Sequence, residues 1–222
     1  MKFLGFDIDL VIFDLDGTLI DSTGIWGKID ETFFARRGQP IPKDYAQAIS
    51  HIGLSAAATY TRVHYFPNEK DEDIIAEWHQ MSLDAYAHDI PLKDGAKELL
   101  EVFAQKGIPM AIATANSPSL YMPALERLGI RKYFTFMVDA TICHEGKNSS
   151  RIYDLAAEHF GVAPENTVVF EDSLRPMEEA TRGGYKVIGI YDEHSTADEE
   201  AHRQCCIYFA SSFNELLSLI EE

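Results

Sequence analysis

Two aspartates, Asp14 and Asp16, stand directly behind the apolar run Leu10–Phe13 and directly before Gly17. An apolar run that ends in a glycine-containing turn is typical of a buried strand in a parallel sheet. Such sheets place their ligands just beyond the carboxyl ends of the strands. Two carboxylates side by side at a strand end repel each other, so they need a cation or a shared proton. The pair therefore predicts the beginning of a site for metal-assisted phosphoryl transfer.

A second pair with the same spacing, Asp7 and Asp9, tests whether spacing alone carries this meaning. No long apolar run precedes that pair and no Gly-Thr follows it, so we interpret it as an exposed lead-in. Asp and Gly also end strands without any function, which is the ordinary explanation for Asp14 and Asp16. The complete stretch Phe13–Thr18 has every supporting feature and favours chemistry.

Polar residues that could bind phosphate occur at two later points. Thr114 ends the apolar run Ile108–Thr114 and Asn116 follows it; a hydroxyl and an amide can both donate hydrogen bonds to a phosphoryl oxygen. Lys147 lies in the loop before a helix expected from about Ser149, where its charge could neutralise a phosphoryl oxygen or the aspartate pair. Taken singly, Thr and Asn are more often turn residues there, and a lysine is more often a solvated surface group.

Glu171 and Asp172 end another apolar run, Thr167–Phe170. A second acidic strand end would complete an all-oxygen Mg²⁺ site with Asp14. Alone, the two acids could equally cap the helix that follows them. Four polar strand ends in succession, however, supply a nucleophile, an acid, phosphate donors, a cation and metal ligands, and this combination favours catalysis.

Composition restricts the possible partners. The chain has 222 residues, 46% hydrophobic and 25% charged, with a formal net charge of −17. Such a charge disfavours nucleic acid and anionic membranes, and no apolar run approaches the ~20 residues that span a bilayer. The N-terminal residues lack the apolar core of a signal peptide. Three cysteines, Cys143, Cys205 and Cys206, form no disulfide framework. We expect a cytoplasmic protein, a monomer or weak homodimer, that acts on a small phosphorylated metabolite.

The order of elements from about Asp94 onward alternates between helix and strand, which predicts an α/β fold: a Rossmann-like, doubly wound parallel sheet with helices on both faces. Expected helices are Asp94–Gln105, Ser119–Leu128, Ser149 or Ser150 to Phe160, Met177–Arg182 and one from Ser212; expected strands are Ile108–Thr114, Thr167–Phe170 and Lys186–Ile190.

Residues 21–91 break this order, because they carry helical patterns and almost nothing typical of a strand. Seventy residues are too many for a simple connection between two core strands. We predict a helical cap domain over 21–91, inserted into a catalytic core of 1–20 and 92–222 through linkers near Ile20–Thr23 and His88–Lys93. A lid of this kind would exclude water and select the substrate. Its candidate specificity residues are Trp26, His51, Arg62, Trp78 and His79.

Four stretches of the chain resemble, in their order, the four motifs of the haloacid dehalogenase-like hydrolase superfamily: Asp14-Leu15-Asp16-Gly17-Thr18, Thr114, Lys147 and Glu171-Asp172. The resemblance covers essentially the whole chain. The insert resembles the helical cap of phosphoglycolate-phosphatase-like and β-phosphoglucomutase-like members. Dehalogenases proper lack an acid two residues after the nucleophile, so Asp16 points to phosphate chemistry.

The resemblance implies a Mg²⁺-dependent phosphatase that works through an aspartyl-phosphate on Asp14, with Asp16 as general acid and base. It implies phosphate binding by Thr18, Thr114, Asn116 and Lys147, of which Thr114 and Lys147 also count as catalytic. The metal ligands that it implies are Asp14, Asp172, the backbone carbonyl of Asp16, and Glu171 through water.

Two departures from the family pattern indicate which kind of member this chain resembles. The β-phosphoglucomutases carry a histidine where this chain has Trp26, and an arginine for a second phosphate where it has Ala56. We therefore expect a simple phosphatase, with a sugar phosphomutase as the alternative. A non-catalytic phosphoacceptor domain shares the aspartate, acidic pocket, Thr and Lys, but lacks Asp16 and a cap. A degenerate binding protein would not need the intact acids and Lys147.

Overall fold

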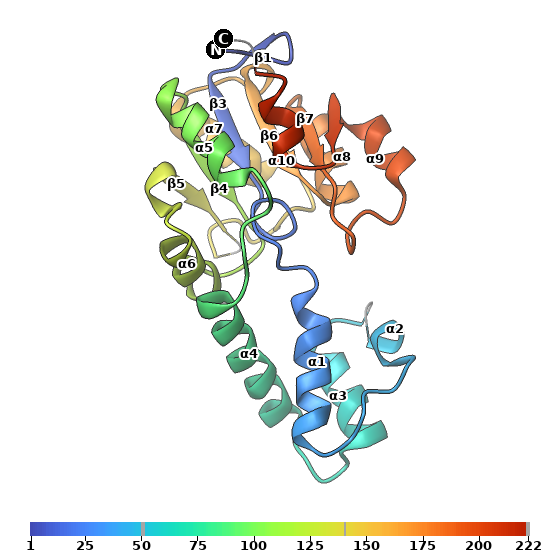
Figure 1. Ribbon diagram of the computed structural model, residues 1–222. Helices are drawn as coiled ribbons and strands as arrows, with labels where there is room; N and C mark the ends of the chain where they lie inside the picture. Colours follow the sequence, from blue (N-terminus) through green and yellow to red (C-terminus); the bar gives the residue numbers. More distant parts are fainter. Residues whose placement is uncertain (50–51, 140, 221–222) are drawn as a thin grey trace. The chain divides into compact units, whose positions relative to one another are not determined.

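The computed structural model describes residues 1–49, 52–139 and 141–220, and the chain divides into two compact units (Figure 1). The sheet unit consists of Met1–Thr23 and Ile90–Glu222, and the helical unit of Gly24–Asp89. The sequence placed the corresponding insertion at 21–91. Each unit has its own buried core.

The sheet unit contains a six-stranded parallel sheet with the order β5-β4-β3-β6-β7-β8. Its strands are β3 (Leu10–Phe13), β4 (Met110–Ala113), β5 (Phe136–Val138), β6 (Thr167–Glu171), β7 (Lys186–Ile190) and β8 (Tyr208–Ala210). The chain builds outward from β3 in one direction and then returns to build outward from β6 in the other. The point between β3 and β6 is where such sheets bind their ligands. The predicted α/β fold class is thus confirmed.

Strand register brings the polar strand ends together. Phe13, the last residue of β3, pairs with Ile112 of β4 on one side and with Phe170 of β6 on the other. The residues that directly follow these strands therefore meet at one edge of the sheet. The packing of apolar side chains from several strands sets this register, so it becomes visible only in the assembled sheet.

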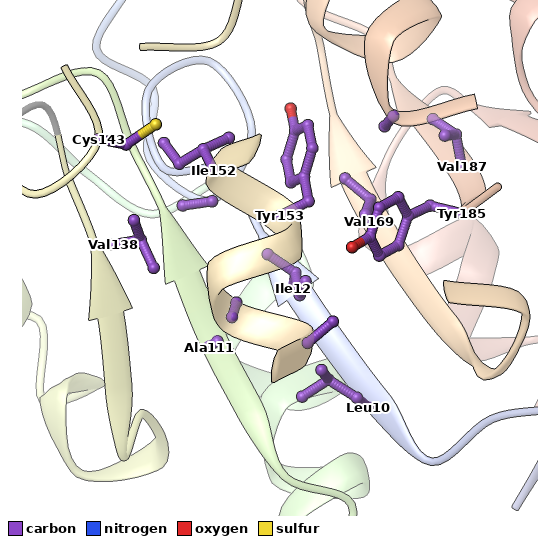
Figure 2. Close-up of a cluster of buried hydrophobic side chains, with 14 of the residues drawn as sticks. Leu10, Ile12, Ala111, Val138, Cys143, Ile152, Tyr153, Val169, Tyr185 and Val187 are labelled. Atoms are coloured by element: carbon purple, nitrogen blue, oxygen red, sulfur yellow. The ribbon is translucent and has the colours of Figure 1, made fainter. Parts of the chain in front are cut away.

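Successive residues of β3 face opposite sides of the sheet, as the pleat requires. Phe13 points toward α5 (Ala96–Gln105) and α10 (Phe213–Leu217), where its ring lies 6.3 Å from that of Phe103 and 6.5 Å from that of Phe213. Leu10 and Ile12 belong to the core on the other face, beneath α7 (Arg151–Phe160) (Figure 2). Helices on both faces leave the strand ends as the accessible edge.

Further elements complete the sheet unit: α6 (Pro118–Arg127), α8 (Leu174–Arg182), α9 (Glu199–Cys205), the 3₁₀ turns η1 (Arg131–Tyr133) and η2 (Pro164–Asn166), and a short hairpin of β1 (Lys2–Phe3) and β2 (Phe6–Asp7). The Asp7 and Asp9 side chains are exposed, as expected of a lead-in, but Ile8 between them is buried.

The helical unit contains α1 (Ile25–Arg36), α2 (Tyr45–Ile49), α3 (Leu54–Tyr65) and α4 (Asp71–His88) (Figure 1). Its core is aromatic, with the rings of Phe33 and Trp78 5.5 Å apart and those of Phe33 and Phe66 5.6 Å apart. Arg37 covers Phe33 at 3.5 Å and forms ion pairs with Glu69. Across the described residues, no helix combines the length and the apolar character that crossing a membrane requires.

Two helix starts differ from the expectation. The helix expected from Asp94 begins at Ala96, because Gly95 adopts a φ of +82° that ends the preceding turn. A side chain at Gly95 would collide with the Asn214 backbone nitrogen, 2.6 Å from an added Cβ. The helix expected from Met177 begins at Leu174, so Pro176 lies within the first turn, where its missing N–H costs no hydrogen bond.

Candidate active site

Asp14 follows β3 directly and lies in a buried cluster of charges. Its backbone N–H donates to the Phe170 carbonyl at 2.9 Å, which continues the pairing with β6 beyond the last residue of β3. The Lys147 ammonium donates hydrogen bonds to Asp14 Oδ1 and, at 2.7 Å, to Glu171 Oε2. Asp14 is 4% exposed and Glu171 1%. One lysine thus joins the two acidic strand ends.

Asp172, the neighbour of Glu171, completes a group of three acids. Asp14, Glu171 and Asp172 each present a carboxylate oxygen, and these oxygens all lie within 4.8 Å of one another. Thr18 is fully buried and donates a hydrogen bond of 3.0 Å to Asp172 Oδ1. Thr18, which the sequence places among the phosphate-binding residues, has its hydroxyl directed to this carboxylate.

Gly17 makes the close approach of the two loops possible. It adopts a φ of +82°, a conformation that L side chains rarely adopt, and an added Cβ would lie 2.5 Å from Asp172 Oδ2. The same Cβ would lie 2.9 Å from the Thr23 methyl group. The glycine therefore allows the turn after Asp14 to press against the second acidic strand end.

Asp16 is oriented by partners outside the acidic group. Its Oδ1 accepts a hydrogen bond from the Ser22 hydroxyl at 2.8 Å, and its Oδ2 accepts one from the Asn116 amide at 2.7 Å. The Thr114 hydroxyl lies 3.4 Å from the same Oδ2 and accepts the Asn116 N–H at 3.1 Å. The two aspartates of the first motif thus differ in these hydrogen bonds: Asp14 accepts one from the Lys147 ammonium, and Asp16 accepts bonds from the Ser22 hydroxyl and the Asn116 amide.

Burial dominates the electrostatics of the acidic group. It raises the pKa of Asp14 to about 6 against the lowering effect of Lys147, and raises the pKa of Glu171 to about 8. Although burial opposes it, the attraction of Asp14 and Glu171 holds the pKa of Lys147 above its usual value. Three carboxylates face one ammonium group, so the cluster carries excess negative charge when ionised.

This donor set fits a hard divalent cation. Mg²⁺ and Ca²⁺ take oxygen ligands, and carboxylates with carbonyl oxygens are the groups that Mg²⁺ selects. A bound cation would offset the charge that Lys147 leaves uncompensated. The Asp16 carboxylate lies outside the three-acid group.

Three residues that the sequence did not single out form hydrogen bonds with the predicted acids: Ser22, Tyr153 and Ser173, the last through its backbone N–H to Glu171 and its hydroxyl to Asp172. Ser22 holds Asp16, as described, and the buried Tyr153 hydroxyl donates to Glu171 Oε2 at 3.1 Å. Tyr153 lies on α7, with its hydroxyl directed toward the carboxyl ends of the strands (Figure 2). Its position on the apolar face of a helix is typical of a core residue, and nothing local signals the hydrogen bond.

The candidate specificity residues have different surroundings within the helical unit. Trp26 is 48% exposed and His79 is exposed, whereas Trp78 is buried in the aromatic core and its Nε1 has no hydrogen-bond partner. Arg62 forms an ion pair with Asp71. His51 lies outside the described residues. Trp78 is accounted for by packing, and Trp26 and His79 present side chains at the surface.

Known proteins resemble this chain in sequence and in fold. A family model described as haloacid dehalogenase-like hydrolase matches residues 11–190, a range that includes every candidate site residue. A Thermotoga maritima protein named phosphorylated carbohydrates phosphatase is 26% identical over 216 residues, covering 97% of this chain and 99% of its own. The phosphoglycolate phosphatase of Nitrosococcus oceani is 25% identical over 186 residues, or 81% of this chain and 82% of its own.

A solved structure from Thermotoga maritima, described as a candidate β-phosphoglucomutase, has the same fold. It superposes with a TM-score of 0.85 and is 26% identical, covering 95% of this chain and 97% of that one.

Proposed function

The chain belongs to the haloacid dehalogenase-like hydrolases and is a phosphoric monoester hydrolase, and we propose that it transfers the phosphoryl group of a small phosphorylated metabolite first to Asp14 and then to water. The observation that carries this proposal is that Asp14 and Asp16, two residues apart, have different hydrogen-bond partners. Asp14 lies beside Lys147 in the acidic group, and Asp16 accepts hydrogen bonds from Ser22, Thr114 and Asn116.

In the first half of the reaction, a carboxylate oxygen of Asp14 attacks phosphorus while the bond from phosphorus to the leaving oxygen breaks. Asp16 gives a proton to that oxygen as it leaves. The bonds from Ser22 and Asn116 support this role, because they orient the Asp16 carboxyl independently of Asp14. Lys147 and Thr114 stabilise the charge on the phosphoryl oxygens.

In the second half, Asp16 takes a proton from water as the water oxygen attacks the aspartyl-phosphate, and the bond to Asp14 breaks. Asp14 is then free for another cycle. Asp14, Asp172 and the backbone carbonyl of Asp16 would hold Mg²⁺, with Glu171 close by. Bound there, the ion supplies positive charge for the phosphoryl oxygens and for the crowded carboxylates.

We assign substrate selection to the helical unit, in the role of the predicted cap domain. Relatives named for phosphorylated carbohydrates and for phosphoglycolate point to a small phosphorylated carbohydrate or hydroxy acid. The exposed Trp26 ring is available for the organic part of the leaving group. Ala56, exposed at the start of α3, has no cationic group for a second phosphate. These residues favour a phosphatase over a sugar phosphomutase.

A panel of phosphorylated metabolites, assayed for release of inorganic phosphate with Mg²⁺ and with EDTA, tests the proposal. We expect release with Mg²⁺ and none from the Asp14→Asn variant, whose circular dichroism should match the wild type. Retention of wild-type activity by that variant would exclude Asp14 as the nucleophile. Isomerisation of a sugar phosphate without net phosphate release would identify the mutase instead. If no phosphomonoester is turned over, the proposal is wrong, and a phosphoacceptor domain or a binding protein becomes the better interpretation.

A further inference from the structure

A further buried carboxylate, Asp192, lies beyond the end of β7 and takes no part in the chemistry proposed above. It is 2% exposed. Its Oδ1 accepts hydrogen bonds from the backbone N–H groups of His194 at 2.9 Å and Ser195 at 3.1 Å. The Lys93 ammonium lies 2.6 Å from Oδ2, and the Thr23 hydroxyl lies 2.9 and 3.0 Å from the two oxygens.

Thr23 and Lys93 come from the two segments that connect the sheet unit with the helical unit. Thr23 is the last residue before that unit, and Lys93 follows soon after its last residue, Asp89. One carboxylate therefore bonds both the entering and the leaving segment. The four donors of this carboxylate leave it well compensated, although it is buried.

The two segments are also paired with each other. Ile20 and Leu92 form an antiparallel bridge. The Asp21 N–H donates to the Pro91 carbonyl at 3.0 Å, and the Lys93 N–H donates to the Leu19 carbonyl at 2.9 Å. We call residues 19–23 and 91–93 the connecting ribbon. Asp192 binds one side chain from each strand of this ribbon.

The connecting ribbon reaches the candidate active site through two neighbouring residues. Ser22 donates the 2.8 Å hydrogen bond to Asp16 Oδ1. The methyl group of Thr23 lies against Gly17, 2.9 Å from where a Cβ there would be. Thr23 thus bonds Asp192 with its hydroxyl and packs on the turn after Asp16 with its methyl group, so a shift of Thr23 would displace Ser22 from Asp16.

We propose that Asp192 is a positioning residue: by holding Thr23 and Lys93 together, it fixes the connecting ribbon so that Ser22 orients the Asp16 carboxyl. This inference rests on the proposed function, in which Asp16 protonates the leaving oxygen. An ion pair that served stability alone would affect all substrates equally. A residue that orients the acid matters most where the leaving oxygen needs a proton.

Esters with different leaving groups separate these two roles. The p-nitrophenolate of p-nitrophenyl phosphate leaves with little help from an acid, whereas the alkoxide of an alkyl phosphate requires protonation. Thr23→Val keeps the methyl contact with Gly17 and removes the bond to Asp192. We expect its kcat for the alkyl phosphate to fall about tenfold more than its kcat for p-nitrophenyl phosphate, with similar KM values. Asp192→Asn should show the same split, and Thr23→Ser, which keeps the hydroxyl, should not.

Amide hydrogen exchange of the same variants reports on the ribbon without any activity. We expect exchange of the amides of residues 19–23, 92 and 93 to rise at least about tenfold in Thr23→Val and Asp192→Asn, while β3 and β6 stay protected. Unchanged exchange in the ribbon overturns the proposal. Equal losses on both esters also overturn it, because they leave Asp192 with a stabilising role alone. If the wild type hydrolyses neither ester, the proposed function is wrong, and so is the role of Asp16 in it. The exchange measurement still shows in that case whether Asp192 holds the ribbon.

Discussion

Lys147 donates a hydrogen bond to Asp14 from a position 133 residues away in the sequence. The same ammonium group binds Glu171, so a single buried cation serves two acidic strand ends. Asp172 brings a third carboxylate within 4.8 Å. The excess of negative charge favours a bound cation, and that cation together with Lys147 would supply the positive charge that a phosphoryl group requires.

Replacing Lys147 with methionine should impair both stability and turnover. The substitution leaves the buried Asp14 and Glu171 carboxylates without their cation, so the free energy of unfolding in metal-free buffer should fall by about 3 kcal/mol. Turnover of a phosphomonoester should fall about 100-fold, because a donor to the phosphoryl oxygens is lost. Urea unfolding and steady-state kinetics measure the two effects. Lys97→Met, at an exposed position on α5, is the control, and equal behaviour of the two variants would contradict the role of Lys147.

Binding of Mg²⁺ should depend on Asp172 and not on the Asp16 side chain. Asp172 belongs to the three-acid group, whereas the Asp16 carboxylate does not. In thermal unfolding, Mg²⁺ at about 100 times its Kd should stabilise the wild type by about 2.7 kcal/mol. Asp172→Asn should lose most of this stabilisation, and Asp16→Asn should keep it while losing turnover. Loss of the Mg²⁺ effect in Asp16→Asn would show that its carboxylate is a ligand.

Gly17→Ala should disrupt the acidic group specifically. The added methyl group would lie 2.5 Å from Asp172 Oδ2 in addition to the strain at a φ of +82°. Gly5→Ala provides a matched control, since Gly5 has a φ of +80° and no atom within 4 Å of an added Cβ. Both variants should pay about 1 kcal/mol for the backbone strain, but only Gly17→Ala should lose the Mg²⁺-induced rise in melting temperature. If Gly5→Ala lost that rise as well, strain and not contact with Asp172 would be responsible.

Asp30 should make the stability of the helical unit depend on pH. The side chain is 7% exposed, and burial raises its pKa from an ordinary value of 3.8 to about 7. Between these values the folded chain keeps a proton that the unfolded chain releases, so stability falls as pH rises and levels off above about 7. Asp30→Asn should therefore gain more over the wild type at pH 8 than at pH 5, by on the order of 2 kcal/mol.

Urea unfolding at the two pH values measures this gain. Asp73→Asn changes an exposed carboxylate on α4 and serves as the control. A gain for Asp30→Asn that is the same at both pH values would mean that the carboxyl is already ionised at pH 5 in the folded chain.

The sequence predicted the strands that are buried on both faces and missed those at the edges. β3, β4, β6 and β7 lie inside the sheet, so each is a continuous apolar run that stands out from its surroundings. β5 and β8 are edge strands of three residues and are partly exposed. An apolar run of that length occurs equally in loops, and neither strand was predicted.

By itself the sequence determined which residues could do chemistry and that parallel strands would bring them to one edge of a sheet. This was possible because Asp14, Thr114 and Glu171 each stand at the end of an apolar run, a relation between neighbours in the chain. Only the tertiary structure decided which side chains orient the site. Ser22 donates a hydrogen bond to Asp16, Tyr153 to Glu171 and Thr18 to Asp172. Asp192 accepts one from Thr23, in the connecting ribbon that also contains Ser22. Such bonds depend on strand register and on close packing at glycines such as Gly17, and neither is a property of a local stretch of sequence.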